Sequence, residues 1–62
     1  MNKQEIERYR KVATLIGTQL RSALTYLSEK VDSAAAQRHV HAAVVTAKDL
    51  EKLLAQACRE AH

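Results

Sequence analysis

The side chains that could do chemistry in this 62-residue chain are few and widely spaced. His39 and His41 are two residues apart, so on a helix they project roughly 200° apart. One metal ion needs helical ligands three or four residues apart, which this pair does not provide. Cys58 is the only cysteine, so no disulfide forms within the chain. Cys58 falls in an apolar pattern that predicts a buried, inert thiol. His62 is the last residue of the sequence. We therefore predict no metal site.

Arrangements for catalysis or cofactor binding are also missing from the sequence. There is no serine–histidine–acid set and no glycine-rich phosphate loop, since Gly17 is the single glycine. A chain of this length encloses no pocket of ordinary ligand size. We predict no catalytic residue, no cofactor and no enzymatic activity, which leaves a binding role.

The composition predicts long helices. Apolar residues make up 47% of the chain, with one glycine and no proline, phenylalanine or tryptophan. Chains rich in Ala, Leu, Glu, Lys and Arg with so few turn residues fold as helices. No apolar run approaches the ~18 residues of a membrane span, and residues 1–5 show no secretory leader. A lone thiol fits a reducing compartment, so we expect the protein in the cytoplasm.

Two amphipathic patterns, with apolar residues three or four apart, cover residues 3–30 and about 34–60. The break between them is expected at residues 31–34, where Asp32 and Ser33 are both good N-cap residues. A short link between two long helices implies an antiparallel hairpin. We predict an all-α fold, a single helical hairpin domain over residues 1–62.

The two apolar stripes are expected to face each other across the hairpin. Gly17, with Ala13 one turn before it, either admits a close neighbouring helix or is simply tolerated. The expected stripes comprise Ile6, Tyr9, Ala13, Ile16, Leu20, Leu24, Leu27 and Val31 in the first helix, and Ala36, Val40, Ala43, Val44, Ala47, Leu50, Leu54, Ala57 and Cys58 in the second.

Further apolar residues flank these stripes on a helical wheel, including Ala35, Ala42 and Thr46. Ordering so short a chain costs roughly 1.5 kcal/mol per residue, which one small core barely offsets. We therefore expect a dimer or a partner protein to cover the flanks, although isolated exposed apolar residues are common on protein surfaces. The residues predicted to bind this partner are Val12, Leu15, Gln19, Tyr26 and Leu53.

The charge pattern does not favour nucleic acid. Ten Lys and Arg residues against seven Asp and Glu give a net charge of +3, spread along the chain. Nucleic-acid-binding domains usually carry a denser basic stripe. Arg8, Arg10 and Lys11 form a modest basic cluster, which we interpret as a solvated helix face.

One segment resembles a known family. Residues 19–27, QLRSALTYL, are similar to the first-helix pattern Q-L-x-x-A-L-x-x-L of YscE/PscE-type proteins, small co-chaperones of the bacterial type III secretion needle. Weaker likeness extends to Gln37, Val40 and Leu50-Glu51, and chain length and two-helix organisation agree. The link lacks the family's glycine. The residues that carry the match are Gln19, Leu20, Ala23, Leu24 and Leu27.

This resemblance implies a specific function. Such co-chaperones are helical hairpins that bind a larger helical-repeat chaperone, and together they hold the needle subunit monomeric in the cytoplasm before export. The expected partners are therefore that chaperone and the needle subunit, with a homodimer when the hairpin is alone. The hairpin would stabilise the larger chaperone and would not catalyse a reaction. Through needle secretion it would contribute to bacterial virulence.

A second resemblance points to a different class. Residues 1–5 and 13–19 are similar to the first helix of Rop, a dimeric hairpin that binds paired RNA loops and regulates plasmid copy number. Lys3 and Gln19 would then correspond to RNA-contacting positions. Leu15 stands where that family has an aromatic residue, and the second helix lacks its acidic character. A self-contained homodimer or an antitoxin-like adaptor is a third interpretation.

Overall fold

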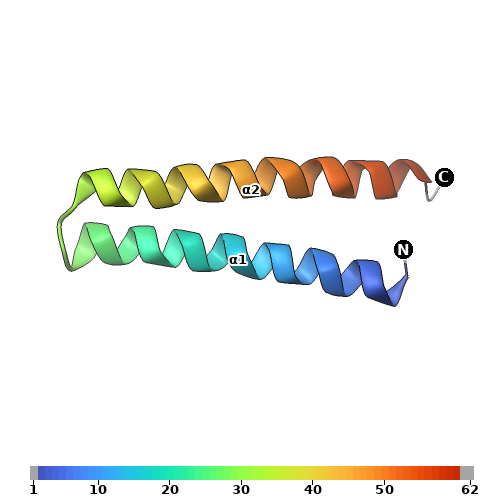
Figure 1. Ribbon diagram of the computed structural model, residues 1–62, viewed down its shortest axis with the longest axis horizontal. Helices are drawn as coiled ribbons and strands as arrows, with labels where there is room; N and C mark the ends of the chain where they lie inside the picture. The colour runs from blue at the N-terminus through green and yellow to red at the C-terminus, as the bar shows by residue number, and fades with distance from the viewer. Residues whose placement is uncertain (1, 61–62) are drawn as a thin grey trace.

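The computed structural model describes residues 2–60 and confirms the all-α helical hairpin. Helix α1 spans Lys3–Ser28, and helix α2 spans Ser33–Glu60 and runs back antiparallel beside it (Figure 1). The molecule measures 46 × 17 × 10 Å, the size of two helices in a single layer. His62 lies outside the described residues.

Each helix begins at a side chain that caps its first turn. Asn2 Oδ1 accepts a hydrogen bond of 2.9 Å from the Glu5 amide, and Asp32 Oδ1 accepts one of 3.0 Å from the Ala35 amide. Such caps satisfy amides that have no partner inside the helix, and each contributes about 1 kcal/mol. Of the two expected N-cap residues, Asp32 takes the role, because the Ala36 amide already donates to its carbonyl, and Ser33 is the first residue of α2.

The link occupies residues 29–32, so the expected break at 31–34 was placed two residues too late. The Glu29 amide still bonds the Thr25 carbonyl at 2.9 Å, and the Asp32 amide bonds the Tyr26 carbonyl at 2.8 Å. Between them Val31 takes a φ of 49°, in the left-handed region. A β-branched residue rarely adopts this conformation, which usually falls to glycine or asparagine.

We expect Val31→Gly to raise the free energy of unfolding by about 1 kcal/mol, because glycine takes a positive φ without strain. Urea unfolding at fixed protein concentration measures the change. Val31→Ala is the control, since it removes the exposed side chain but keeps the Cβ. If alanine stabilises as much as glycine, the gain comes from the side chain and the explanation by backbone strain is wrong.

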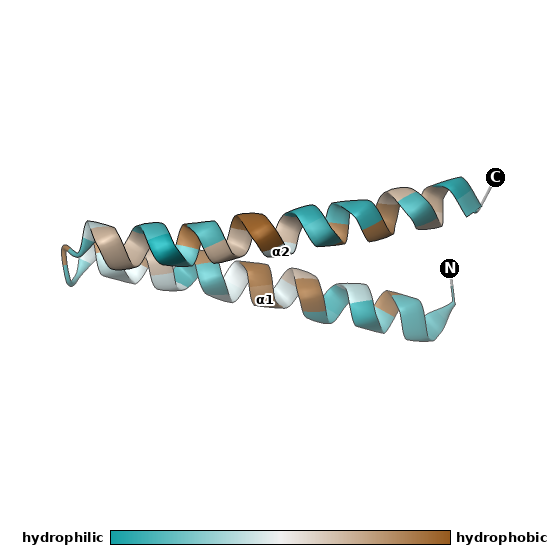
Figure 2. Cartoon of the chain, turned by 45° about the horizontal axis from the view of Figure 1, so that its top comes forward, coloured by the Kyte–Doolittle hydropathy of each residue, from teal (hydrophilic) through white to brown (hydrophobic). Residues whose placement is uncertain are grey.

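The core lies in the half of the hairpin nearest the link. Its buried residues, among those described, are all alanines: Ala23, Ala35, Ala36 and Ala43. Alanine lets two helix backbones approach closely, whereas larger side chains keep them apart. Toward the open end the seam residues are half-buried and include Tyr9, Leu50 and Leu53, and the two ribbons diverge there in both Figure 1 and Figure 2.

Gly17 does not mark a close approach within the hairpin. A Cβ built on it would meet nothing within 4 Å, so α2 does not pass near this position. The side of α1 around Gly17 is therefore open surface.

Over residues 2–60, neither helix holds a stretch apolar enough to cross a membrane.

Candidate protein-binding face

The side chains that could bind a metal ion or react do not come together in the hairpin. His39 is half-buried, with its ring stacked on Tyr26 at 5.2 Å between centroids, while His41 is exposed. Cys58 is exposed too, so the expectation of a buried thiol was wrong. In the described part of the chain, no three His, Cys, Asp or Glu side chains gather as a metal site requires.

The hydroxyl groups of four threonines are used within the helices. Each donates a hydrogen bond to the backbone carbonyl one turn earlier, at 2.9 to 3.2 Å; they are Thr14, Thr18, Thr25 and Thr46. Two hollows on the surface are lined by α1 alone, so neither encloses a ligand between the helices.

The contact between the helices follows a regular repeat, which we call the internal seam. Its residues are buried or half-buried and recur at alternating steps of three and four, the spacing of coiled-coil helices. The internal seam comprises Glu5, Tyr9, Val12, Ile16, Gln19, Ala23 and Tyr26 on α1, and Ala36, His39, Ala43, Thr46, Leu50, Leu53 and Ala57 on α2.

Most of the stripe expected to join the helices lies outside this seam. Tyr9, Ile16, Ala36, Ala43, Leu50 and Ala57 do lie in it. The remaining members are exposed, and the expectation that they pack between the helices was wrong; they are Ile6, Ala13, Leu20, Leu24, Leu27 and Val31, with Val40, Val44, Ala47, Leu54 and Cys58. Most of the leucine and isoleucine side chains thus face outward, although Ile16, Leu50 and Leu53 lie in the seam.

These exposed residues of the two helices form one surface, which we call the apolar face. Each directly follows a seam residue, as Leu20 follows Gln19 and Val40 follows His39. Every α-helix is right-handed, so the residue after a seam position is rotated about 100° around the helix axis, always in the same sense along the chain. Because the two helices lie side by side and run in opposite directions, this rotation brings the following residue of both helices to the same side of the hairpin. The apolar face comprises Ile6, Ala13, Leu20, Leu24 and Leu27 of α1, and Val40, Val44, Ala47, Leu54 and Cys58 of α2.

The opposite side of the hairpin, which we call the polar face, carries several exposed basic side chains. It includes Lys11 on α1 and Arg38, Lys52 and Arg59 on α2, all exposed. Buried or half-buried small residues lie here beside the seam, namely Ser22, Ala35 and Ala42. They let the helices close on this side, while leucine and valine side chains stay uncovered on the other. The hydropathy colouring of Figure 2 shows brown and teal residues alternating along both helices, as two distinct faces require.

Four of the five residues predicted to bind a partner lie in the internal seam. Val12, Gln19, Tyr26 and Leu53 are half-buried there, and Tyr26 also has the Lys30 ammonium 4.8 Å from its ring centroid. Leu15 is exposed, on the polar face. Four of these side chains therefore pack α1 on α2 in the single hairpin, and the assignment of the five residues to a partner stays a prediction.

Gln19 is the polar exception in the middle of the seam. Its Oε1 atom is buried and has no hydrogen-bond partner among residues 2–60. A buried amide oxygen left without a donor costs about 1–3 kcal/mol. A single polar residue at such a position can fix the register of paired helices at the expense of stability.

Comparison with known proteins adds no relative. No protein-family model, curated protein or solved structure matches the chain. The assignment of a function therefore depends on the two faces of the hairpin and on the segment at residues 19–27.

Proposed function

We propose that this chain is a non-enzymatic binding protein that presents its apolar face to a helical partner, acting as a cytoplasmic co-chaperone of a type III secretion needle. The observation that carries the proposal is the apolar face itself. A row of exposed leucine and valine side chains along two helices is typical of a site of interaction in small proteins. Leucine and valine anchors along two helices suit a groove or a concave surface lined by other helices.

The segment that resembles the co-chaperones divides between the two surfaces. Gln19 and Ala23 lie in the internal seam, and Leu20, Leu24 and Leu27 lie on the apolar face. One pattern thus supplies small or polar residues that pack the hairpin and large residues that are left for a partner. This division supports the proposal, because a co-chaperone hairpin needs one set of residues for folding and another for docking.

The partner that fits is a larger helical-repeat chaperone, with the needle subunit held by the pair. Stacked helical repeats offer extended concave surfaces on which a two-helix layer can lie. Covering the apolar face there removes it from water, which stabilises both proteins. The hairpin's contribution is to stabilise the chaperone that keeps the needle subunit monomeric.

The RNA-binding alternative is less well supported by the geometry. Gln19, one of the two residues that would contact RNA, has its amide oxygen buried in the internal seam. Lys3 is exposed at the start of α1. RNA affinity would depend on released counterions and would fall steeply between about 50 and 200 mM salt. Titration of labelled RNA hairpins at both salt concentrations tests this alternative.

We expect Leu24→Lys to weaken binding to a purified helical-repeat chaperone of the same genome's type III secretion system by about 100-fold. The substitution would bury an unpaired ammonium in an apolar interface. Leu15→Lys is the matched control, because it changes the same residue type on the polar face. Isothermal titration measures both affinities, and circular dichroism checks that each variant remains helical. Equal loss in the two variants, or no binding by the unchanged protein, would contradict the proposal.

A further inference from the structure

We propose that a second copy of this chain covers the apolar face when the partner is absent, and that the two hairpins pair with their links at the same end. In this arrangement α1 of each copy lies against α2 of the other, and Arg10 of each faces Glu51 of the other. The inference does not depend on the secretion role, because it follows from exposed area, helical repeat and charge.

The exposed area is too large for a stable compact chain. The hairpin exposes 5045 Å² at a mass of 6.9 kDa. A compact monomer of this mass exposes about 4000 Å², and a compact dimer about 6600 Å². Two hairpins joined into such a dimer would bury about 3500 Å² in total, within the range of about 2000–5000 Å² that obligate homodimers bury.

The apolar face has the repeat that pairs helices. Positions 6, 10, 13, 17, 20, 24 and 27 of α1, and positions 37, 40, 44, 47, 51, 54 and 58 of α2, alternate in steps of three and four. This is a second coiled-coil seam, displaced by one residue from the internal seam. A second copy carries the same seam over the same length, so two apolar faces would match along both helices.

Shape also matches at the position of the single glycine. Gly17 lies 11 residues before Ser28, and Val44 lies 11 residues after Ser33, so both lie at the same height above the link. The space over Gly17 is open for at least 4 Å. With the links at the same end, the partner's Val44 would fill the space over Gly17.

Charge decides between the two ways of pairing. Arg10 and Glu51 are the charged residues of the second seam within the described chain. Arg10 lies 18 residues before Ser28 and Glu51 lies 18 residues after Ser33, so both lie about 27 Å from the link. A two-fold axis along the hairpin therefore places each Arg10 opposite the other copy's Glu51, twice per dimer.

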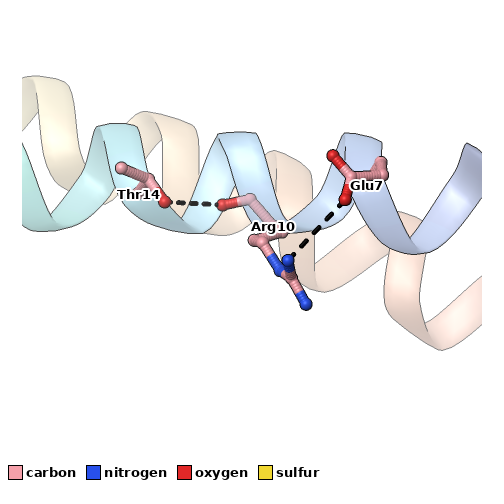
Figure 3. Close-up of polar contacts among 3 residues, drawn as sticks. All are labelled: Glu7, Arg10 and Thr14. Carbon is pink, nitrogen blue, oxygen red and sulfur yellow. Dashed lines mark hydrogen bonds and ion pairs between the residues drawn. The ribbon is translucent and has the colours of Figure 1, made fainter.

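The alternative two-fold axis lies across the hairpin and places each helix opposite its own copy. Arg10 would then lie opposite leucines of the second α1, and Glu51 opposite valines of the second α2. Both charges would lose water without gaining a partner, which is costly. In the single hairpin, among residues 2–60, the Arg10 guanidinium forms an ion pair with Glu7, at 3.6 Å and exposed (Figure 3), and such a pair holds it weakly.

The decisive experiment exchanges the two charges between copies. Arg10→Glu alone places two carboxylates opposite each other, and Glu51→Arg alone places two guanidinium groups opposite each other. Each variant should therefore dimerise about tenfold more weakly than the unchanged protein. Mixed in equal amounts, the two variants can form a heterodimer. In it, the unchanged Arg10 of one copy faces the unchanged Glu51 of the other, and the two substituted residues face each other. Both facing pairs are then opposite in charge. We expect sedimentation velocity to show the mixture dimerising about tenfold more tightly than either variant alone. A mixture no tighter than its components would overturn the pairing.

The apolar face is tested with matched lysine substitutions. Leu20 and Leu15 are 48% and 49% exposed, and Val44 and Val45 are 43% and 47% exposed, but only Leu20 and Val44 belong to the apolar face. Leu20→Lys and Val44→Lys should sediment as monomers at concentrations where Leu15→Lys and Val45→Lys remain dimers. Dissociation of the control variants, or an unchanged protein that stays monomeric to about 100 µM, would overturn the inference.

The outcomes also separate this inference from the secretion role. Where a variant loses helix as it dissociates, the charge-exchange mixture still decides, because it should restore dimer and helix together. An unchanged protein that is monomeric yet binds the helical-repeat chaperone would overturn the dimer and leave the proposed function standing.

Discussion

Replacing Ala43 with leucine is expected to lower the free energy of unfolding by up to about 3 kcal/mol. Ala43 is 2% exposed and lies in the internal seam, in the half of the hairpin nearest the link, so the three extra carbons of leucine must displace neighbouring groups. The helices must separate, and that separation would uncover the neighbouring alanines. A domain of this size has a total stability of only several kcal/mol, so much of it would be lost.

Ala55→Leu is the matched control for this prediction. Ala55 is exposed on α2, away from both the seam and the apolar face, and leucine is nearly as good a helix former as alanine. Urea unfolding followed by circular dichroism, at one protein concentration for all variants, gives both free energies. If Ala43→Leu unfolds at the same urea concentration as the unchanged protein, the close approach at Ala43 is wrong.

The second large effect is expected at Tyr26, where replacement by alanine should cost about 2–3 kcal/mol. Its ring stacks on His39 with an angle of 19° between the planes, and the Lys30 ammonium lies 4.8 Å from the ring centroid. The substitution removes apolar contact across the seam, an aromatic stack and a cation–π contact together. These contacts join the end of α1, the link and the first turns of α2.

Tyr26→Phe separates the ring from its hydroxyl group. Phenylalanine keeps the stack and the cation–π contact, so we expect it to stay within about 0.5 kcal/mol of the unchanged protein. Thermal and urea unfolding of both variants measure the difference. A loss in Tyr26→Phe as large as that in Tyr26→Ala would show that the hydroxyl, not the ring, holds the link.

The helical hairpin could be predicted from the sequence because its signals are local. Apolar residues three or four apart, a missing proline and N-cap residues near position 32 specify two helices and a break whatever surrounds them. The break was misplaced because Val31 adopts a left-handed conformation that its side chain disfavours. Propensity therefore favoured continuing the first helix past Ser28.

The assignment of faces failed for a different reason. The internal seam and the seam displaced from it by one residue have the same helical spacing. Hydrophobicity alone favours the displaced seam as the helix contact, because it contains Leu20, Leu24 and Leu27. In the structure the helices pack instead through the seam that holds the buried alanines Ala23, Ala36 and Ala43, where small side chains allow close contact. The stripe that is strongest in the sequence is thus the one left exposed. A second repeat of alternating three and four was the signal that could have identified the apolar face.

The placement of the alanines also sets the order in which the hairpin assembles. Tyr26 and His39, which stack beside the link, are only 13 positions apart in the chain, whereas residues at the open end close a far longer loop. Loop closure costs more entropy as the loop lengthens, so we expect the first contacts to form beside the link and pairing to proceed toward the termini. The buried alanines would then lie in the region that folds first. We expect the open end, where the helices diverge, to be completed last and to separate first on unfolding.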